Sequence, residues 1–245
     1  MPSTFKRLYF FWKQRRFWRL FKREPQEIFT EIYEHNIWGG EQGVFFSGTG
    51  SNDPRVEIYI SNLAAFIQEN QIKTITDLGC GDFSVMQKVL DRVDHQVEYI
   101  GIDIVKDLID FNNSNYATER IRFQQANIID DALPEGELVL VRQVLQHLSN
   151  AQISAILRKI AKYKWALLSE HLPINGSIVF NVDKIPGPHI RMKMNSGVFI
   201  DKEPFNITNS RVLFEYRQDD PVKGKMVPAV IRTYLVFGCL DRHEI

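Results

Sequence analysis

Two short segments of this 245-residue chain hold the residue types most able to do chemistry. The first is 77–82, with the sequence DLGCGD, and the second is 101–103, with the sequence GID. Glycine has no Cβ and adopts positive φ at little cost, so a turn through Gly79 and Gly81 can bring its backbone against a ligand. About twenty residues later, Asp103 offers a carboxylate that can accept hydrogen bonds from both hydroxyls of a ribose. The spacing predicts a site for an adenine nucleoside.

The flanking residues predict a strand–turn–helix–strand unit around this site. A β-branched run at 72–77 leads into the glycine turn, an amphipathic stretch at 83–92 leaves it, and a second strand is predicted at 97–103. Ligands of parallel sheets bind outside the carboxyl ends of the strands. The two segments are therefore expected side by side at one edge of a sheet.

The rest of the chain continues the alternation of strands and helices as far as Glu170, and beyond that residue no further helix is predicted. Further helices are predicted at 24–36, 54–70, 106–116 and 149–163, and further strands at 121–126, 137–142 and 165–170. Asp53 is expected to cap the second of these helices, with Pro54 at its first position. This order predicts a parallel sheet with helices on both faces. Beyond Glu170 the sequence predicts a strand at 178–182, a loop at 189–209, a strand at 212–216, a polar turn at 218–224 and a strand at 230–237, the last two strands forming an antiparallel hairpin at the sheet edge.

The composition fits one domain with added segments. Hydrophobic residues make up 44% of the chain and charged residues 24%, which is enough for a full core. Two cysteines argue against a disulfide framework, and Cys80 suits the glycine turn as a small residue rather than as a nucleophile. The predicted organisation is a basic aromatic segment at 1–23, a helix and glycine-rich lid region at 24–53, and a main domain at 54–245 with an insert at about 184–209.

The charge is unevenly distributed between the first 23 residues and the rest. Residues 1–23 hold eight basic and eight aromatic residues and no acid, which leaves 22 basic and 30 acidic residues in the remainder. An acidic body argues against a nucleic-acid partner. The segment 1–23 is too charged to span a bilayer and has no signal-peptide pattern, so the expected location is cytoplasmic. Two roles for 1–23 stay open, namely peripheral attachment to an anionic membrane surface and docking on this domain or on a protein partner.

Four segments of the chain form a set, namely the glycine turn at 77–81, the acid Asp103, the sequence ANI at 126–128 and the sequence VLVRQVLQHL at 139–148. Together they resemble the class I S-adenosylmethionine-dependent methyltransferases. The resemblance covers about residues 54–182, in the order of the family. A nicotinamide dehydrogenase would carry a third glycine where Ser84 stands. The resemblance implies a Rossmann-like, seven-stranded, mostly parallel sheet and S-adenosyl-L-methionine as the cofactor.

The resemblance also implies roles for residues at the first two strand ends. Asp77 would orient the amino end of the cofactor through the turn. Gly79 and Gly81 would let the backbone approach its methionine part. Asp103 would accept hydrogen bonds from the ribose hydroxyls, and Ile104 would touch the adenine ring.

Two later segments would complete the cofactor site. Asn127 would accept a hydrogen bond from the adenine amino group where the family often has an acid. Ile128 would cover the ring. Arg142 and Gln143, at the end of the fourth strand, are placed where the sulfonium and the acceptor should meet.

Methyl transfer to a hydroxyl needs alignment and an outlet for a proton. A general base is therefore expected near the carboxyl ends of the fourth and fifth strands. The candidates are His147, one helical turn after the fourth strand, and Glu170 and His171, which end the fifth. Each of the three could instead be structural.

Two regions are candidates for acceptor binding. The stretch 32–40, which contains Trp38, and the SGTGS sequence at 47–51 resemble leaders of bacterial methyltransferases linked to surface-glycan or natural-product pathways. Such a glycine-rich loop can close over the cofactor as a lid. In the insert, Arg191 could hold a phosphate or carboxylate, or could belong to a solvated loop. The histidine and acid spacings predict no metal site.

The sequence thus favours methyl transfer to a hydroxyl of a small molecule or glycan. N-methylation of protein or nucleic acid is the first alternative, although the fourth segment lacks an Asn-Pro-Pro-Tyr-type motif. A non-catalytic cofactor-binding partner protein is the second, and a nicotinamide oxidoreductase is the third.

Overall fold

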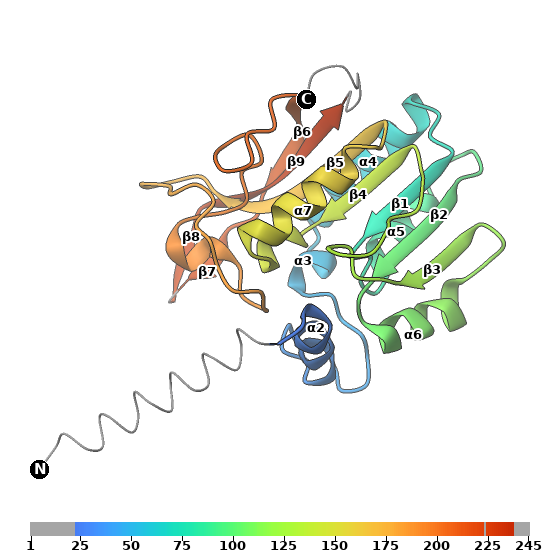
Figure 1. Cartoon of the computed structure of the whole chain (residues 1–245), viewed down its shortest axis with the longest axis horizontal. Helices are drawn as coiled ribbons and strands as arrows, with labels where there is room; N and C mark the ends of the chain where they lie inside the picture. Colours follow the sequence, from blue (N-terminus) through green and yellow to red (C-terminus); the bar gives the residue numbers. More distant parts are fainter. Residues whose placement is uncertain (1–22, 223, 238–245) are drawn as a thin grey trace, which may run out of the picture.

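The computed structural model describes residues 23–222 and 224–237, and its centre is a seven-stranded sheet (Figure 1). The strand order is β3-β2-β1-β4-β5-β9-β6. The strands are β1 (Thr74–Leu78), β2 (Glu98–Asp103), β3 (Ile121–Gln125), β4 (Leu138–Arg142), β5 (Trp165–Pro173), β6 (Ser210–Arg217) and β9 (Ala229–Phe237). Strands β1 to β5 pair in parallel, whereas β9 is antiparallel to both of its neighbours. The predicted fold class is therefore confirmed.

Helices cover both faces of this sheet and one end of it. They are α2 (Pro25–Glu34), α3 (Thr49–Asn52), α4 (Val56–Glu69), α5 (Ser84–Leu90), α6 (Lys106–Tyr116) and α7 (Asn150–Ile160), with 3-10 turns at Leu145–His147 and Arg191–Met194. Helices α4 and α5 bury one side of the sheet and α7 buries the other, which gives two separate hydrophobic clusters. Helix α2 lies beyond the carboxyl ends of β1 and β4, over the edge where the site was expected (Figure 1).

Helix α4 begins two residues later than expected. Pro54 lies outside the helix, which starts at Val56, and Asp53 closes a tight turn by accepting a hydrogen bond from the Arg55 amide at 2.8 Å. The short helix α3 stands directly before this turn. The prediction that Asp53 caps this helix was wrong. The unpredicted helix α3 ends at Asn52, so Asp53 lies in the turn between α3 and α4 and Arg55 takes the capping position.

The C-terminal third differs most from expectation. Residues 178–182 form no strand, because β9 occupies the edge of β5 and leaves no free partner there. Asn181 instead adopts a left-handed conformation with φ +52°. The polar stretch at 218–224 contributes to a small hairpin of β7 (Asp220–Val222) and β8 (Lys225–Val227). The expected closing hairpin is present as β6 and β9, with β9 inserted next to β5.

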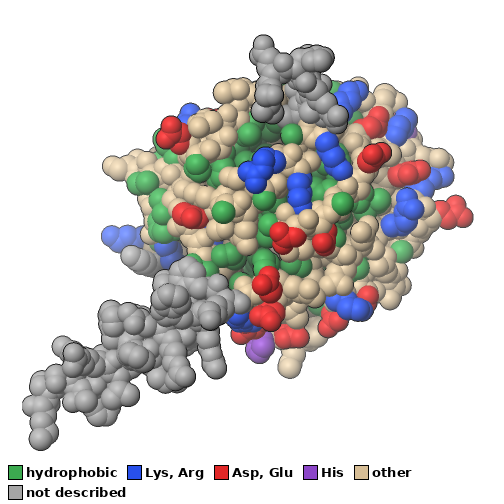
Figure 2. All heavy atoms as spheres, in the orientation of Figure 1, with side chains coloured by type: hydrophobic (Ala, Val, Ile, Leu, Met, Phe, Trp, Pro, Cys, Tyr) green, Lys and Arg blue, Asp and Glu red, His purple; other side chains and the backbone are tan. Residues whose placement is uncertain are grey.

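The surface and the termini bear on the predicted partners. On the face shown in Figure 2, acidic and basic side chains are interspersed over the described residues. Within 23–222 and 224–237, no helix is both long and apolar enough to cross a bilayer. The membrane and partner roles predicted for 1–23 fall almost entirely on residues 1–22, which lie outside the described residues, and they stay predictions.

Candidate cofactor and acceptor site

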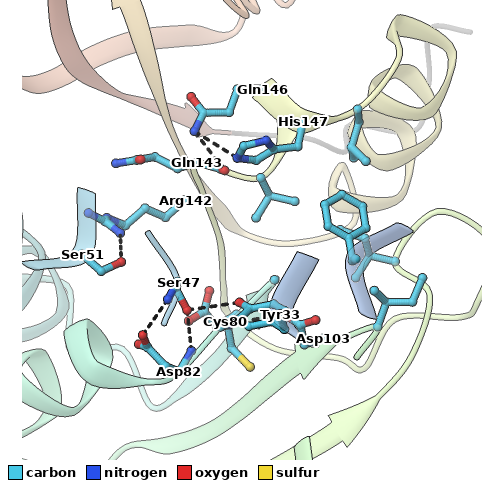
Figure 3. A pocket seen from close by; sticks show the side chains of 18 of the residues that line it. Tyr33, Ser47, Ser51, Cys80, Asp82, Asp103, Arg142, Gln143, Gln146 and His147 are labelled. Atoms are coloured by element: carbon cyan, nitrogen blue, oxygen red, sulfur yellow. Dashed lines mark hydrogen bonds between the residues drawn. The ribbon is translucent and has the colours of Figure 1, made fainter. Parts of the chain in front are cut away.

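A pocket lies at the carboxyl ends of β1, β2 and β4, under helix α2 (Figure 3). It collects all nine sequence-predicted cofactor residues, together with Trp38 and His147. The parallel strands bring these residues together, since their ends meet at the same edge of the sheet. The predicted cofactor contacts themselves stay predictions.

The glycine turn after β1 is packed too tightly for any other residue. Gly79 has φ +77° and Gly81 has φ +56°, both in the left-handed region. A Cβ on Gly79 would lie 2.4 Å from Cγ2 of Val144, and one on Gly81 would lie 2.3 Å from Oγ of Ser47. The turn therefore needs glycine to admit its protein neighbours as well as a ligand.

Asp103 is fixed by the same turn. Its Oδ2 accepts a hydrogen bond from the Gly81 amide at 3.3 Å, and its Oδ1 accepts one from the Val105 amide at 3.1 Å. Burial raises the pKa of this carboxyl, while the backbone N–H donors lower it. The carboxyl group is thus held at the pocket wall, with lone pairs left to accept hydroxyl groups.

Asp77 lies deeper, at the end of β1. Its Oδ2 accepts a hydrogen bond from the Tyr99 hydroxyl at 2.8 Å. Burial raises the pKa of Asp77 to about 6, although Tyr99 and Arg142 act in the opposite direction. A cationic ligand group nearby would favour its ionised form.

Arg142 links the end of β4 to the lid, which is the segment 24–53. Its Nη2 donates to the carbonyl of Gly50 at 2.8 Å, and its guanidinium carbon lies 5.0 Å from the centre of the Tyr59 ring. Its Nε is buried and has no partner among the described residues. Among the described residues, Arg142 is the one basic side chain other than histidine that lines the pocket.

Asn127 lines the pocket but already uses its side chain. Its Oδ1 accepts a hydrogen bond from the Ile129 amide at 3.0 Å, and its Nδ2 donates to Asp130 at 2.8 Å. An adenine contact through Oδ1 would have to use the second lone pair of this atom. Ile104 and Ile128 line the same part of the pocket.

The lid is fastened to the glycine turn by a reciprocal pair of hydrogen bonds. The Ser47 amide donates to Oδ2 of Asp82 at 2.9 Å, and the Asp82 amide donates to Oγ of Ser47 at 2.8 Å (Figure 3). The Tyr33 hydroxyl lies 3.2 Å from the same Oγ. The glycine-rich segment therefore covers the pocket, as a lid would.

The other side of the pocket is lined by aromatic rings and by the turn after β4. The rings of Trp38 and His147 lie 5.0 Å apart, and Phe29 lies 6.3 Å from Trp38. Nδ1 of His147 is 3.2 Å from the carbonyl of Gly187, which fixes Nδ1 as the protonated nitrogen and Nε2 as the acceptor. Burial, and then the charge of Lys184, lowers the pKa of His147 to about 3. The ring is therefore neutral at physiological pH.

Comparison with known proteins agrees with this geometry. A family model described as a methyltransferase domain matches residues 75–163, which contain the glycine turn and β1 to β4. A curated relative, O-methyltransferase 2 of Dictyostelium discoideum, is 28% identical over 122 residues. Both matches support the resemblance of this chain to the class I S-adenosylmethionine-dependent methyltransferases.

Solved methyltransferase structures share the fold at low sequence identity. Human N-acetylserotonin methyltransferase, in complex with S-adenosylmethionine, superposes with a TM-score of 0.50 at 16% identity, over 86% of this chain and 60% of its own. Magnesium protoporphyrin IX methyltransferase from Synechocystis PCC 6803 superposes with a TM-score of 0.51 at 13% identity, over 88% of this chain and 100% of its own. The match to the Dictyostelium protein covers 48% of this chain and 36% of that protein, so the match spans little more than a third of that protein's length.

Two of the residues predicted to be catalytic do not lie at the pocket. His171 is buried, and its Nε2 lies 2.7 Å from the carbonyl of Gln218. Glu170 is fully buried, and its two oxygens accept the amides of Leu145 and Gln146, both at 3.0 Å. Burial raises the pKa of Glu170 to about 8, as in many catalytic acids, but both oxygens are engaged by the backbone. The structure thus gives both residues structural partners, because β5 continues to Pro173 and keeps them inside the sheet.

Arg191 is also placed differently from the expectation. It is 1% exposed, and its guanidinium donates only to protein groups. It is therefore not available to hold a phosphate or carboxylate of the acceptor. The insert packs against the domain here and is not a solvated loop.

Several pocket residues were missed by the sequence reasoning. They are Phe29, Tyr33, Ser47, Ser51, Tyr59 and Gln146. Ser47 and Ser51 belong to the SGTGS stretch, which the sequence did mark as a lid. Tyr59 lines the pocket from helix α4. The hydrophobic pattern of this helix predicted only a core position for Tyr59, because a tyrosine ring fits such a pattern whether or not its hydroxyl reaches a pocket.

Proposed function

We propose that this methyltransferase transfers the methyl group of S-adenosylmethionine to a hydroxyl of an uncharged small molecule or sugar. The observation that carries the proposal is the charge distribution of the pocket. Its charged residues in the described chain are Asp77, Asp82, Asp103 and Arg142. All four lie on the cofactor side, where the three acids would repel an anionic acceptor. The acceptor side offers aromatic rings and neutral amides. The curated relative named O-methyltransferase 2 supports the choice of oxygen.

The residues present fit the cofactor. Asp103 would accept the ribose hydroxyls, and the guanidinium of Arg142, the one basic group other than histidine on the pocket wall among the described residues, would pair with the methionine carboxylate. Asp77 would face the ammonium end of the same amino acid. When bound, the cofactor supplies a methyl group that its sulfonium has already activated, so the protein must mainly align the acceptor and exclude water.

The acceptor would lie between Trp38 and the turn that carries His147. A flat or ring-shaped body would stack on the indole. Nε2 of His147, which lies 3.5 Å from Nε2 of Gln146, would accept a hydrogen bond from the hydroxyl in place of that long contact. As the oxygen–methyl bond forms and the hydroxyl loses its proton, Nε2 would take that proton and, because the pKa of His147 is lowered to about 3, would pass it on to solvent. The closed lid would keep water from the reacting atoms.

The test is incubation with the cofactor and matched acceptor panels. One panel contains uncharged polyols, phenols and sugars, and the others contain their phosphorylated or carboxylated analogues, peptides and RNA. Mass spectrometry would record S-adenosylhomocysteine and locate the methyl group. We expect turnover on uncharged hydroxyl compounds alone. Methylation of nitrogen in peptides or RNA would support the alternative, and tight cofactor binding without turnover on any panel would favour a non-catalytic partner.

A further inference from the structure

The Arg191 side chain is buried in a cage of backbone carbonyls. Its Nη2 donates to the carbonyl of Leu148 at 2.8 Å, and its Nη1 donates to the carbonyls of Gln146 at 3.1 Å and Leu145 at 3.4 Å. Its Nε donates to the carbonyl of Val182 at 2.8 Å. The planar guanidinium fork thus joins the insert to residues 145–148, which we call the acceptor turn.

The acceptor turn is held from its other side by Glu170. The two oxygens of this carboxyl group accept the amides of Leu145 and Gln146. A buried acid therefore satisfies the first amides of the turn, and a buried cation satisfies its carbonyls. This one turn places Gln146 and His147 on the pocket wall.

The insert also holds His147 and Trp38 directly. The carbonyl of His147 accepts hydrogen bonds from Nζ of Lys184 and from the Gly187 amide, each at 3.0 Å. The carbonyl of Pro188 accepts the indole N–H of Trp38 at 3.2 Å. Residues 184–188 therefore bridge the acceptor turn and the lid, and Arg191 anchors the chain that leaves this bridge.

We propose that Arg191 is a positioning residue for the acceptor side of the pocket. It fixes the acceptor turn, and through that turn the imidazole of His147, while it touches neither the cofactor nor the acceptor. Only the naming of this wall as the acceptor side rests on the proposed function. A planar donor is needed here because it satisfies several carbonyls at once, which a lysine ammonium on a flexible stem does less well.

The test compares Arg191→Met and Arg191→Lys with Lys193→Met, an exposed charge in the same 3-10 turn. Hydrogen exchange would be followed by mass spectrometry in peptides covering 143–149 and in peptides covering β1 and β2. Nitrogen NMR of labelled histidine would report which ring nitrogen of His147 carries the proton. Calorimetry with S-adenosylhomocysteine would report the cofactor side.

We expect Arg191→Met to speed exchange at 143–149 by more than about tenfold, since several charge-assisted hydrogen bonds are lost. The Nδ1-protonated form of His147 should give way to a tautomer mixture, while the cofactor Kd changes by less than about threefold. Arg191→Lys should fall between Arg191→Met and wild type, and Lys193→Met should match wild type. With an acceptor in hand, kcat should fall while KM for the cofactor stays constant.

Unchanged exchange at 143–149 in a folded Arg191→Met protein would overturn the proposal. Equal acceleration in β1 and β2 would also overturn it, because Arg191 would then support the fold as a whole. If Arg191→Met does not fold, the same comparison is made with Arg191→Lys. These readouts need no acceptor, so an absence of hydroxyl methylation by wild type would reject the proposed function and leave this result standing.

Discussion

The two sides of the pocket are built in different ways. The centre of the cofactor side, the glycine turn and Asp103, comes from residues 77–82 and 101–105, which are close in sequence and held mostly by the backbone of β1 and β2. The acceptor side joins the lid, the acceptor turn and the insert, and one of its hydrogen bonds links residues 150 positions apart in the chain, Trp38 and Pro188. When one side of a pocket is built from residues close in the chain, they form a motif that can be recognised in the sequence. When a side is built from distant segments, its residues are scattered along the chain and form no motif.

Of the changes that test this difference between the two sides, a substitution in the glycine turn should have the largest effect. Gly79→Ala should destabilise the protein by about 2–4 kcal/mol and abolish measurable cofactor binding, because the residue has φ +77° and the new Cβ would meet Val144 at 2.4 Å. Thermal or urea unfolding and calorimetry with S-adenosylhomocysteine measure the two effects.

A matched control separates backbone strain from packing. Gly43 has φ +82°, yet a Cβ there would meet nothing within 4 Å. Gly43→Ala should therefore cost only the strain, about 1–2 kcal/mol, and should leave cofactor affinity near that of wild type. Equal loss of affinity in both variants would show that close packing at the turn is not what the cofactor side needs.

The acid at the end of β2 should give the next largest effect. Asp103→Ala should weaken cofactor binding by about 1.5–3 kcal/mol, since the hydrogen bonds that the carboxylate accepts from the ribose hydroxyls are lost. Asp107→Ala, an exposed acid on α6, is the control. If Asp103→Ala bound the cofactor as tightly as wild type, the ribose would not bind at this edge of the sheet.

Cofactor binding should also depend on pH through Asp77. The free protein holds the pKa of this carboxyl at about 6, and a bound ammonium group would lower it, so binding releases a proton. Affinity should therefore rise with pH and level off above the pKa of about 6. It should be about tenfold weaker one pH unit below that value.

Calorimetry in buffers with different ionisation enthalpies would count the released proton. In Asp77→Asn the dependence should vanish, because the amide does not titrate. A pH profile that persists in this variant would assign the effect to another group.

A substitution that weakens the contact between the lid and the glycine turn should have the smallest effect of those predicted. Ser47→Ala removes a hydroxyl that accepts the Asp82 amide and should cost about 1 kcal/mol of lid closure. Stopped-flow fluorescence should show faster cofactor release. Ser114→Ala, which removes an exposed hydroxyl bonded only within helix α6, is the control. Identical release rates in the two variants would mean that the hydrogen bond between Ser47 and Asp82 does not limit the rate of cofactor exchange.

Tertiary structure alone decided the acceptor side. The sequence offered His147, Glu170 and His171 as polar residues near strand ends, and Arg191 as a cation in the insert. Burial and partners separate them, since His147 faces the pocket while the other three satisfy backbone groups inside the fold. The strand expected at 178–182 failed for a related reason, because its hydrophobic pattern says nothing about whether a sheet edge is free.

The sequence by itself determined the resemblance to the methyltransferases, the parallel sheet and the sheet edge at which the pocket lies. Asp77, the two glycines of the turn and Asp103 could be read directly, because strand periodicity and positive φ are local properties that leave local patterns. The roles of Glu170 and Arg191 depend on which backbone groups the folded chain brings to them. Such long-range partners are fixed only when the lid, the acceptor turn and the insert pack together.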